Sequence, residues 1–170
     1  METWDAIRAR RNVREYDDRS IDDVVVDRIL EAGRRSPSAV NWQPWDFVLV
    51  TDRSSLQRLS GTGPGTSHLA GAAAAVALVA PVRDDERREW VQFDLGQAAF
   101  SIMLAAADQG VGSGHASVAD QDVARQVLGY PADRFCPYLV ALGYPAGRPL
   151  TPIARPKRRP FEEVVHRGRW

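Results

Sequence analysis

The chain has 170 residues, a length that suits one domain able to bury a substantial core. Its 22 basic and 22 acidic residues cancel, which argues against a nucleic acid or a membrane surface as partner. Cys136 is the single cysteine, so no internal disulfide forms, and no apolar run is long enough to span a bilayer; we therefore expect a cytoplasmic protein.

Helices are predicted from apolar periodicity and from the residues that begin and end them. The first is expected from Thr3 to Asn12, with acidic residues at its start and arginines at its end, as the helix dipole favours. The second follows a cap at Ser20 and stops before Pro37. Three further helices are predicted at residues 54–59, 86–109 and 120–128. The helix over 86–109 is the longest, and its small apolar middle would let another helix approach closely.

Four apolar runs predict strands at residues 46–51, 73–80, 111–115 and 136–143. The run at 46–51 is apolar on both faces and is therefore expected inside the sheet. Alanine dominates 73–80, which leaves a helix as an alternative there. Glycines predict that the strand at 111–115 ends in a turn, and that Gly61–Ser67 is a loop. Helices and strands thus alternate irregularly around a small mixed or antiparallel sheet, which indicates an α+β fold.

The last segment, residues 145–170, is rich in proline and basic residues and cannot form a core of its own. Its large apolar side chains are Phe161, Val164, Val165 and Trp170. On a free tail these groups would be exposed, so we expect the tail to pack on another surface, for which a second copy of the chain is the obvious candidate. The prediction is one domain over residues 1–170 with an extended C-terminal tail.

Positive charge gathers near both ends of the chain. Arg10, Arg11 and Arg14 lie within five residues, and Arg158 and Arg159 follow in the tail. Forked guanidinium groups match the oxygens of a phosphate monoester, so the cluster suits one phosphorylated ligand. The alternative is that these arginines only complement a helix dipole at the surface.

A second motif, Pro37–Trp45, is a rigid polar turn with amide donors and flat rings. Its Ser38 and Asn41 either contact a ligand or satisfy the backbone of the turn, whereas Trp42 and Trp45 are expected to be core or interface aromatics. Together the two motifs predict a site for a ligand with a phosphate at one end and a planar, hydrogen-bonding ring at the other. Flavin mononucleotide (FMN) fits that description.

Further motifs follow these two in order along the chain. They are Asp94-Leu95-Gly96-Gln97-Ala98, Gly110-Val111-Gly112, Leu142-Gly143-Tyr144-Pro145, and the segment from Arg158 to Val165. The whole series resembles the FMN-dependent nitroreductase family over nearly the full chain. The resemblance implies a nitroreductase-like fold with a long central helix, an interlocked homodimer, and two flavins that each sit across the interface.

The resemblance also implies which residues bind the cofactor. The phosphate and ribityl chain would meet Arg10, Arg11, Asn12, Arg158 and Arg159, and Arg14 would point to the pyrimidine edge. The partner subunit would supply Pro37, Ser38, Ala39 and Asn41. Backbone contacts near the central ring nitrogen would come from Gly112, Ser113, Gly114 and His115.

The implied activity is transfer of electrons from NADH or NADPH to nitroaromatics, quinones or similar small acceptors. The flavin carries this chemistry, so no catalytic side chain is assigned, and the chain has no dinucleotide-binding fingerprint. Both substrates would visit one open site in turn, by a ping-pong mechanism. No metal site is expected, because His68 and His166 lack partners at ligand spacing.

Several questions stay open at this point. Gly61–Ser67 replaces a polar segment, often with lysine, of the family, so a second contact to the pyrimidine edge is not identified. Asp94 is expected to be a polar anchor rather than an acid, and His115 either faces the ring or lies at the surface. Other functions are a flavin-holding or flavin-sensing protein, a specialised flavin or deazaflavin dehydrogenase or dehalogenase, and a domain that binds another phosphate compound.

Overall fold

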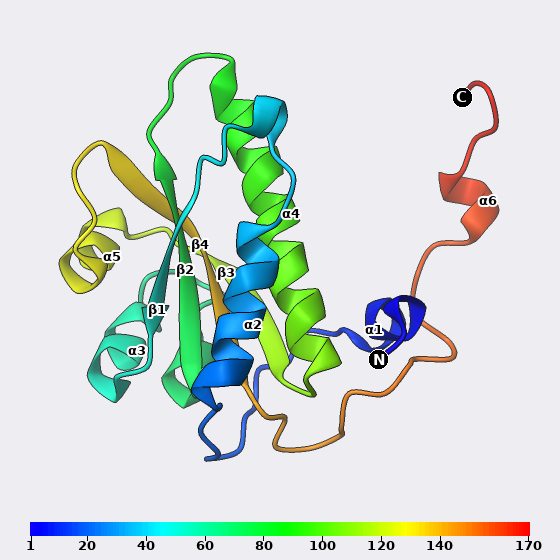
Figure 1. Ribbon diagram of the computed structural model, residues 1–170, viewed down its shortest axis with the longest axis horizontal. Coiled ribbons are helices and arrows are strands. Elements are labelled where there is room, and N and C mark those ends of the chain that lie inside the picture. The colour runs from blue at the N-terminus through cyan, green and yellow to red at the C-terminus, as the bar shows by residue number, and fades with distance from the viewer.

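A four-stranded antiparallel sheet forms the middle layer of the protein, and helices cover both of its faces (Figure 1). The structure, a computed structural model, describes residues 1–170. The strands are β1 (Asp46–Val50), β2 (Ala74–Pro81), β3 (Gly112–Ser117) and β4 (Arg134–Gly143), and they lie in the order β1-β2-β4-β3. This arrangement confirms the α+β class and the small sheet.

Two pairs of helices cover the sheet: one face carries α2 and α4, and the other carries α3 and α5 (Figure 1). Their bounds are α2 (Asp23–Arg34), α3 (Arg53–Leu59), α4 (Arg87–Asp108) and α5 (Gln121–Leu128). A short helix α1 (Thr3–Ala9) and a single turn α6 (Phe161–Val164) lie near the two ends of the chain. The predicted helix over 86–109 is confirmed as α4, roughly 33 Å long at 1.5 Å per residue.

Strand β2 divides the interior into two cores. Val76 and Leu78 face the core beneath α2 and α4, whereas Ala75 and Ala77 face the core beneath α3 and α5. Because both faces of this strand are covered and both of its edges are paired, compact apolar side chains suit every position. The helix alternative for residues 73–80 is therefore wrong.

Strand β1 lies at the edge of the sheet, which corrects the prediction that residues 46–51 form an internal strand. It pairs only with β2, and Leu49 is 40% exposed. Phe47 packs toward one core, while Val48 packs toward the other. The apolar pattern on both faces thus reflects helices above and below the strand, which is compatible with an edge position.

The arginine cluster does not end a helix, because α1 stops at Ala9 and residues 10–17 continue as an extended arm. The Val13 N–H donates to the Ser113 carbonyl at 2.8 Å, and Asn12 forms a parallel bridge with the same residue. The arm thereby pairs with the outer edge of β3, which gives its backbone the partners that a longer helix would have supplied. The predicted helix over 3–12 is three residues too long for this reason.

Two glycines of β3 let the arm approach this strand closely. A Cβ atom on Gly112 would come within 2.8 Å of the Val13 side chain, and one on Gly114 within 2.5 Å of the Val13 carbonyl oxygen. Residues 112–115 therefore belong to a strand and not to the predicted turn. The turn lies earlier, at Gly110, whose φ is +71°.

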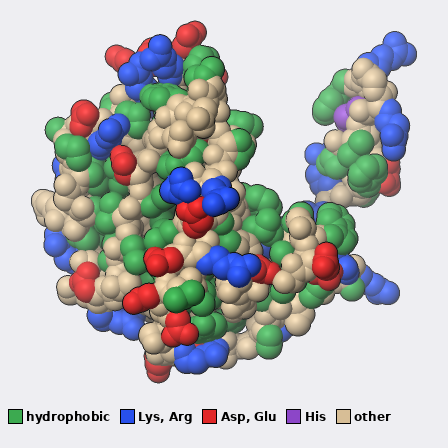
Figure 2. All heavy atoms as spheres, in the orientation of Figure 1, with side chains coloured by type: hydrophobic (Ala, Val, Ile, Leu, Met, Phe, Trp, Pro, Cys, Tyr) green, Lys and Arg blue, Asp and Glu red, His purple; other side chains and the backbone are tan.

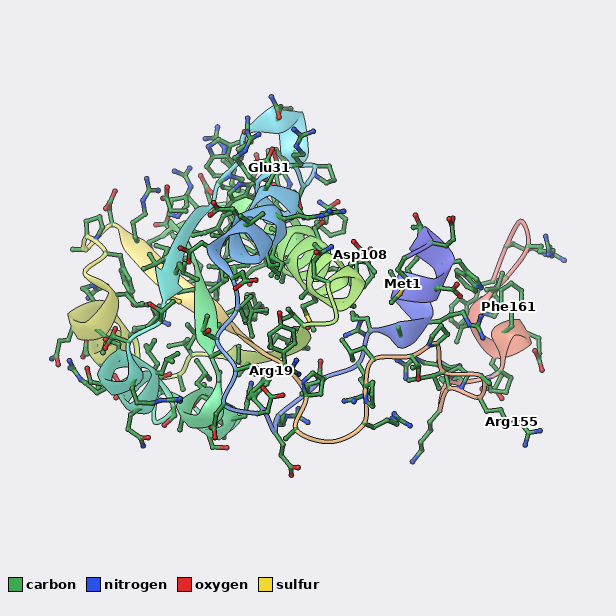
Figure 3. The ribbon with its side chains drawn as sticks, turned by 60° about the horizontal axis from the view of Figure 1, so that its bottom comes forward. Met1, Arg19, Glu31, Asp108, Arg155 and Phe161 are labelled. Carbon is green, nitrogen blue, oxygen red and sulfur yellow. The ribbon has the colours of Figure 1, made fainter.

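The C-terminal tail crosses α1 and then leaves the body of the protein (Figures 1 and 2). The Ile153 N–H donates to the Arg8 carbonyl at 3.1 Å, which fixes the crossing point. Beyond it the tail is exposed: Phe161 is 66% and Trp170 is 97% accessible to solvent. Figure 3 shows α6 and Phe161 beyond α1, with Arg155 directed away from the body. The protomer alone leaves these apolar groups uncovered, so the covering partner expected from the sequence stays a prediction.

Gly114→Ala should lower the free energy of unfolding by about 2 kcal/mol, because the added methyl group meets backbone that cannot rotate aside. Denaturant unfolding followed by circular dichroism measures the loss. Gly71→Ala is the matched control, since nothing lies within 4 Å of its Cβ position. Equal stability of the two variants would contradict the close approach of the arm.

Candidate functional site

The arm and the tail together form a basic groove beside β3. It is lined by Arg10, Arg11, Asn12, His115, Ile153, Pro156, Lys157 and Arg158, and its volume is about 340 Å³. The arm is placed by its pairing with β3, and the tail by the contact of Ile153 with the backbone of α1. The structure thus brings together four of the five residues that were assigned to the phosphate and ribityl chain, namely Arg10, Arg11, Asn12 and Arg158. It also places His115, which was assigned to the central ring nitrogen, in the same groove.

The cations of this groove have no acidic partner. Arg10, Arg11 and Arg158 make no ion pair, and no carboxylate lines the groove. Elsewhere on the surface arginines are commonly paired, as Arg34 is with Glu31. Like charges held together without a counter-charge are an arrangement that an anion stabilises.

Burial further disfavours the charged forms of two of these arginines. It lowers the pKa of Arg10, and the nearby guanidinium of Arg158 lowers that pKa further. Arg11 behaves similarly, with burial first and Arg148 second as causes of its lowered pKa. Both guanidinium groups stay charged at neutral pH, so the lowered pKa values indicate surroundings that disfavour their positive charge and that a bound anion would make more favourable.

A more apolar groove of about 390 Å³ adjoins the basic one and shares Arg10 and His115 with it. Its other lining residues are Gln92, Gly96, Ala99, Phe100, Met103 and Tyr138. The Arg10 guanidinium lies 5.8 Å from the centre of the Phe100 ring, and the Tyr138 hydroxyl donates to Gln92 Oε1 at 2.8 Å. The two grooves therefore form one continuous surface that is charged at one end and flat and apolar at the other.

His115 stands where the two grooves meet. Partial burial is the main cause that lowers its pKa, and the positive charges of Arg10, Arg14 and His68 act in the same direction. The imidazole is therefore neutral at pH 7, with one ring nitrogen that donates and one that accepts a hydrogen bond. The side chain lines both grooves and is also exposed, so the two roles left open from the sequence stay predictions.

Arg14 and Arg159 lie apart from this cluster. Arg14 lines a third, polar groove of about 290 Å³ with Arg11 and Arg148, and the Arg11 guanidinium donates to the Arg148 carbonyl. Arg159 Nε is 3.4 Å from Glu163 Oε2 within the tail. No sequence pattern singles out Arg148, because only the return of the chain after β4 brings it to the arm.

Three predicted backbone contacts lie beneath the arm. Gly112, Ser113 and Gly114 are buried, and Val13 covers them on the side that the arm occupies. The His68 Nε2 atom lies 3.1 Å from the Gly114 carbonyl oxygen, which packs this imidazole under the same stretch. The glycines thus serve the close approach of arm and strand, and their predicted contact with a flavin stays a prediction.

The Pro37–Trp45 loop lies beside the first half of α4, at the top of Figure 1. Gln92, Gly96 and Phe100 line the apolar groove, whereas Asp94 and Gln97 hydrogen-bond to the loop. At 100° per residue these two sets are roughly 130° apart around the helix axis. Within one protomer, α4 therefore separates Pro37, Ser38, Ala39 and Asn41 from the arginine groove.

The backbone of this loop is strained. Val40, Asn41 and Gln43 have φ of 48°, 57° and 55°, in the left-handed region that favours glycine. Such positions cost about 1–3 kcal/mol each and persist only where the surroundings hold them. Trp45 is buried in the core and anchors the end of the loop, so its assignment as a core aromatic is correct.

Other candidate groups do not form a site. The described residues contain no cluster of three or more side chains able to hold a metal ion. Burial raises the pKa of Cys136 to about 12, which keeps its thiol protonated. None of the helices combines the length with the apolar character that crossing a bilayer requires.

The fold is that of an α+β protein, and its adjoining basic and apolar grooves suit a phosphorylated, flat ligand. The sequence profile of the Nitroreductase family matches residues 7–62 and 63–144, so the chain belongs to this family. Family membership identifies the protein as an oxidoreductase. The resemblance inferred from the motifs is confirmed.

Relatives of known sequence cover nearly the whole chain. An Archaeoglobus fulgidus protein with the provisional name NADH dehydrogenase/NAD(P)H nitroreductase is 34% identical, over 96% of each chain. The NADH dehydrogenase of Thermus thermophilus is 31% identical, over 92% of this chain and 91% of its own.

Solved structures agree with this assignment. An FMN-dependent nitroreductase from Clostridium difficile superimposes with a TM-score of 0.85 at 23% identity, over 97% of this chain and 98% of that one. At that identity the likeness concerns the fold alone.

The pKa of His115 in the protein without flavin should lie below the usual value of about 6.5. Sulfate, which keeps two negative charges through this range, should raise that pKa, because the anion stabilises the imidazolium. An NMR titration measures both, with His115→Gln to assign the resonance. A pKa at or above the usual value, or one that sulfate leaves unchanged, would contradict the basic groove.

Proposed function

We propose that the protein is an FMN-dependent oxidoreductase that passes electrons from NADH or NADPH to nitroaromatics, quinones or similar acceptors by a ping-pong mechanism. The observation that carries the proposal is the basic groove, in which Arg10 and Arg158 converge from opposite ends of the chain without a carboxylate. A further support is the FMN dependence of the Clostridium difficile protein with the same fold.

The residues of the two grooves fit FMN in kind. Arg10 and Arg158, with Arg11 and Asn12, would hold the phosphate, since guanidinium and amide groups donate hydrogen bonds to its oxygens. Each charge-assisted bond contributes about 1.5–3 kcal/mol net, so several retain the cofactor without a covalent link. The adjoining groove beside Phe100 offers a flat apolar wall for an aromatic ring system.

When bound, FMN supplies the two-electron chemistry that connects a nicotinamide donor to an acceptor. The protein's own side chains bind and orient the reactants. His115, neutral at pH 7, can donate a hydrogen bond at the junction of the grooves without adding charge there. Arg14 and Arg148 line the third groove beside Arg11, and the field of their two guanidinium groups would favour negative charge that develops on a ligand there.

The proposal includes a homodimer with a site shared between the two subunits. One protomer keeps the Pro37–Trp45 loop and the arginine groove on different sides of α4, so a second copy is needed to bring both motifs to one ligand. Uncovered apolar side chains support this association: Phe93 is 70% exposed on α4, and Phe161 and Trp170 are exposed on the tail.

Purified protein should be yellow, and its released pigment should be FMN. NADH or NADPH should bleach the bound flavin without oxygen, and a nitroaromatic should restore the colour. Steady-state rates should give parallel lines in double-reciprocal plots, because one product leaves before the second substrate binds. Flavin that stays oxidised under both nucleotides would contradict the enzyme and favour a flavin-holding protein. A colourless protein that binds no added FMN would favour another phosphate ligand.

Arg10→Ala combined with Arg158→Ala should raise the Kd for FMN at least about 100-fold, because two charge-assisted contacts to the phosphate are lost. Titration of the flavin-free protein by flavin fluorescence measures this change. The matched control is Arg34→Ala with Arg83→Ala, which removes two arginines that pair with Glu31 and Asp85 elsewhere. Full flavin occupancy in the first double variant would contradict the phosphate assignment.

A further inference from the structure

Asp94 is a buried carboxylate without a cationic partner. It lies on α4, is 1% exposed, and makes no ion pair. Its oxygens accept the Ala39 N–H, at 3.1 Å to Oδ2 and 3.3 Å to Oδ1, and Oδ1 also accepts Gln97 Nε2 at 3.2 Å. Burying a charged group is unfavourable unless its hydrogen bonds are made. The hydrogen bond between Asp94 and the Ala39 N–H is therefore one of the contacts that allow Asp94 to be buried, and it connects α4 to the loop.

Ala39 begins the strained part of the Pro37–Trp45 loop. The 3-10 turn Ala39–Asn41 starts at this residue, and Val40 and Asn41 directly after it have positive φ. Val40 is β-branched and 89% exposed, so its own side chain contributes almost nothing to holding that conformation. The loop therefore depends on hydrogen bonds made by its neighbours.

Hydrogen bonds within the loop and from α4 hold this conformation. The Ser38 hydroxyl accepts the Gln43 N–H at 2.9 Å, and Gln97 Nε2 donates to the Pro37 carbonyl at 3.4 Å. Asp94 is the only charged group among these anchors, and it holds the residue just before the first left-handed position. The Asn41 carboxamide, in contrast, makes no hydrogen bond within the protomer and is exposed.

We infer that Asp94 is a positioning residue: its carboxylate holds the Pro37–Trp45 loop in the left-handed conformation that presents the Asn41 carboxamide to the flavin of the second subunit. This inference rests on the proposed function, since the flavin is the ligand to which the loop is presented. Asp94 itself is buried and lines neither of the two grooves. It acts through the Ala39 N–H, and Gln97 supports it from the next turn of α4.

Asp94→Leu should raise the Kd for FMN at least about tenfold, because one hydrogen bond to a charged group no longer fixes the loop. Asp94→Asn keeps a buried oxygen acceptor for Ala39 and should return the Kd to within about threefold of wild type. Ser101→Ala is the matched control, since Ser101 bonds to Ser36 Oγ at 2.8 Å and joins α4 to the end of α2 without touching the loop. Its Kd should stay within about twofold of wild type.

A second variant removes the same hydrogen bond from the other side. Ala39→Pro deletes the N–H and leaves Asp94 in place, and the extended Ser38 (φ −145°, ψ 156°) suits a residue that precedes proline. It should raise the Kd for FMN as Asp94→Leu does. If Asp94→Leu fails to fold, this variant provides the binding test.

Hydrogen exchange in the flavin-free protein separates this inference from the proposed function. Asp94→Leu should speed exchange of the loop amides at least about tenfold, while Ser101→Ala leaves them unchanged. If wild type binds no FMN, the proposed function fails and the exchange rates alone decide whether Asp94 holds the loop. Unchanged loop exchange in Asp94→Leu, or equal Kd values in Asp94→Leu and Ser101→Ala, would overturn the inference.

Discussion

The site depends on one piece of backbone pairing: the Val13 N–H donates to the Ser113 carbonyl, so the arginine arm lies along the free edge of β3. This pairing stops α1 at Ala9 and turns Arg10 toward the junction of the two grooves. It also explains why β3 carries glycine at positions 112 and 114, where any Cβ atom would collide with the arm. Without this contact the arm would be held only beyond Val13, where Glu15 and Asp17 pair with the backbone of residues 144–146.

The basic groove combines residues from the two ends of the chain. The tail crosses α1 at Ile153 and brings Arg158 to Arg10, although these residues are almost the whole chain apart. The resulting groove holds positive charge without a counter-charge, which suits a dianion at one end of a ligand. The strained loop that would complete the site faces away from it, on another side of α4. In the proposed homodimer, a second copy of the chain would bring the loop of one protomer to the groove of the other.

Much of the fold and of the candidate site could be predicted from the sequence, and the exceptions share a cause. Local patterns predicted α4 and the strand at 136–143, and the order of motifs identified the family. The predicted end of α1 was wrong, because arginines near a helix end also suit an extended arm that pairs with a strand distant in the sequence. The position of β1 was wrong, because an apolar pattern reports covered faces and not paired edges. Arg148 was missed, since only tertiary structure brings it to Arg11.

A crystal structure of the protein grown with FMN tests the central claim most directly. The account predicts phosphate oxygens within hydrogen-bond distance of the Arg10 and Arg158 guanidinium groups of one protomer, with the partner's Asn41 at the same flavin. A flavin held entirely by one protomer, or one whose phosphate lies away from Arg10, would contradict it.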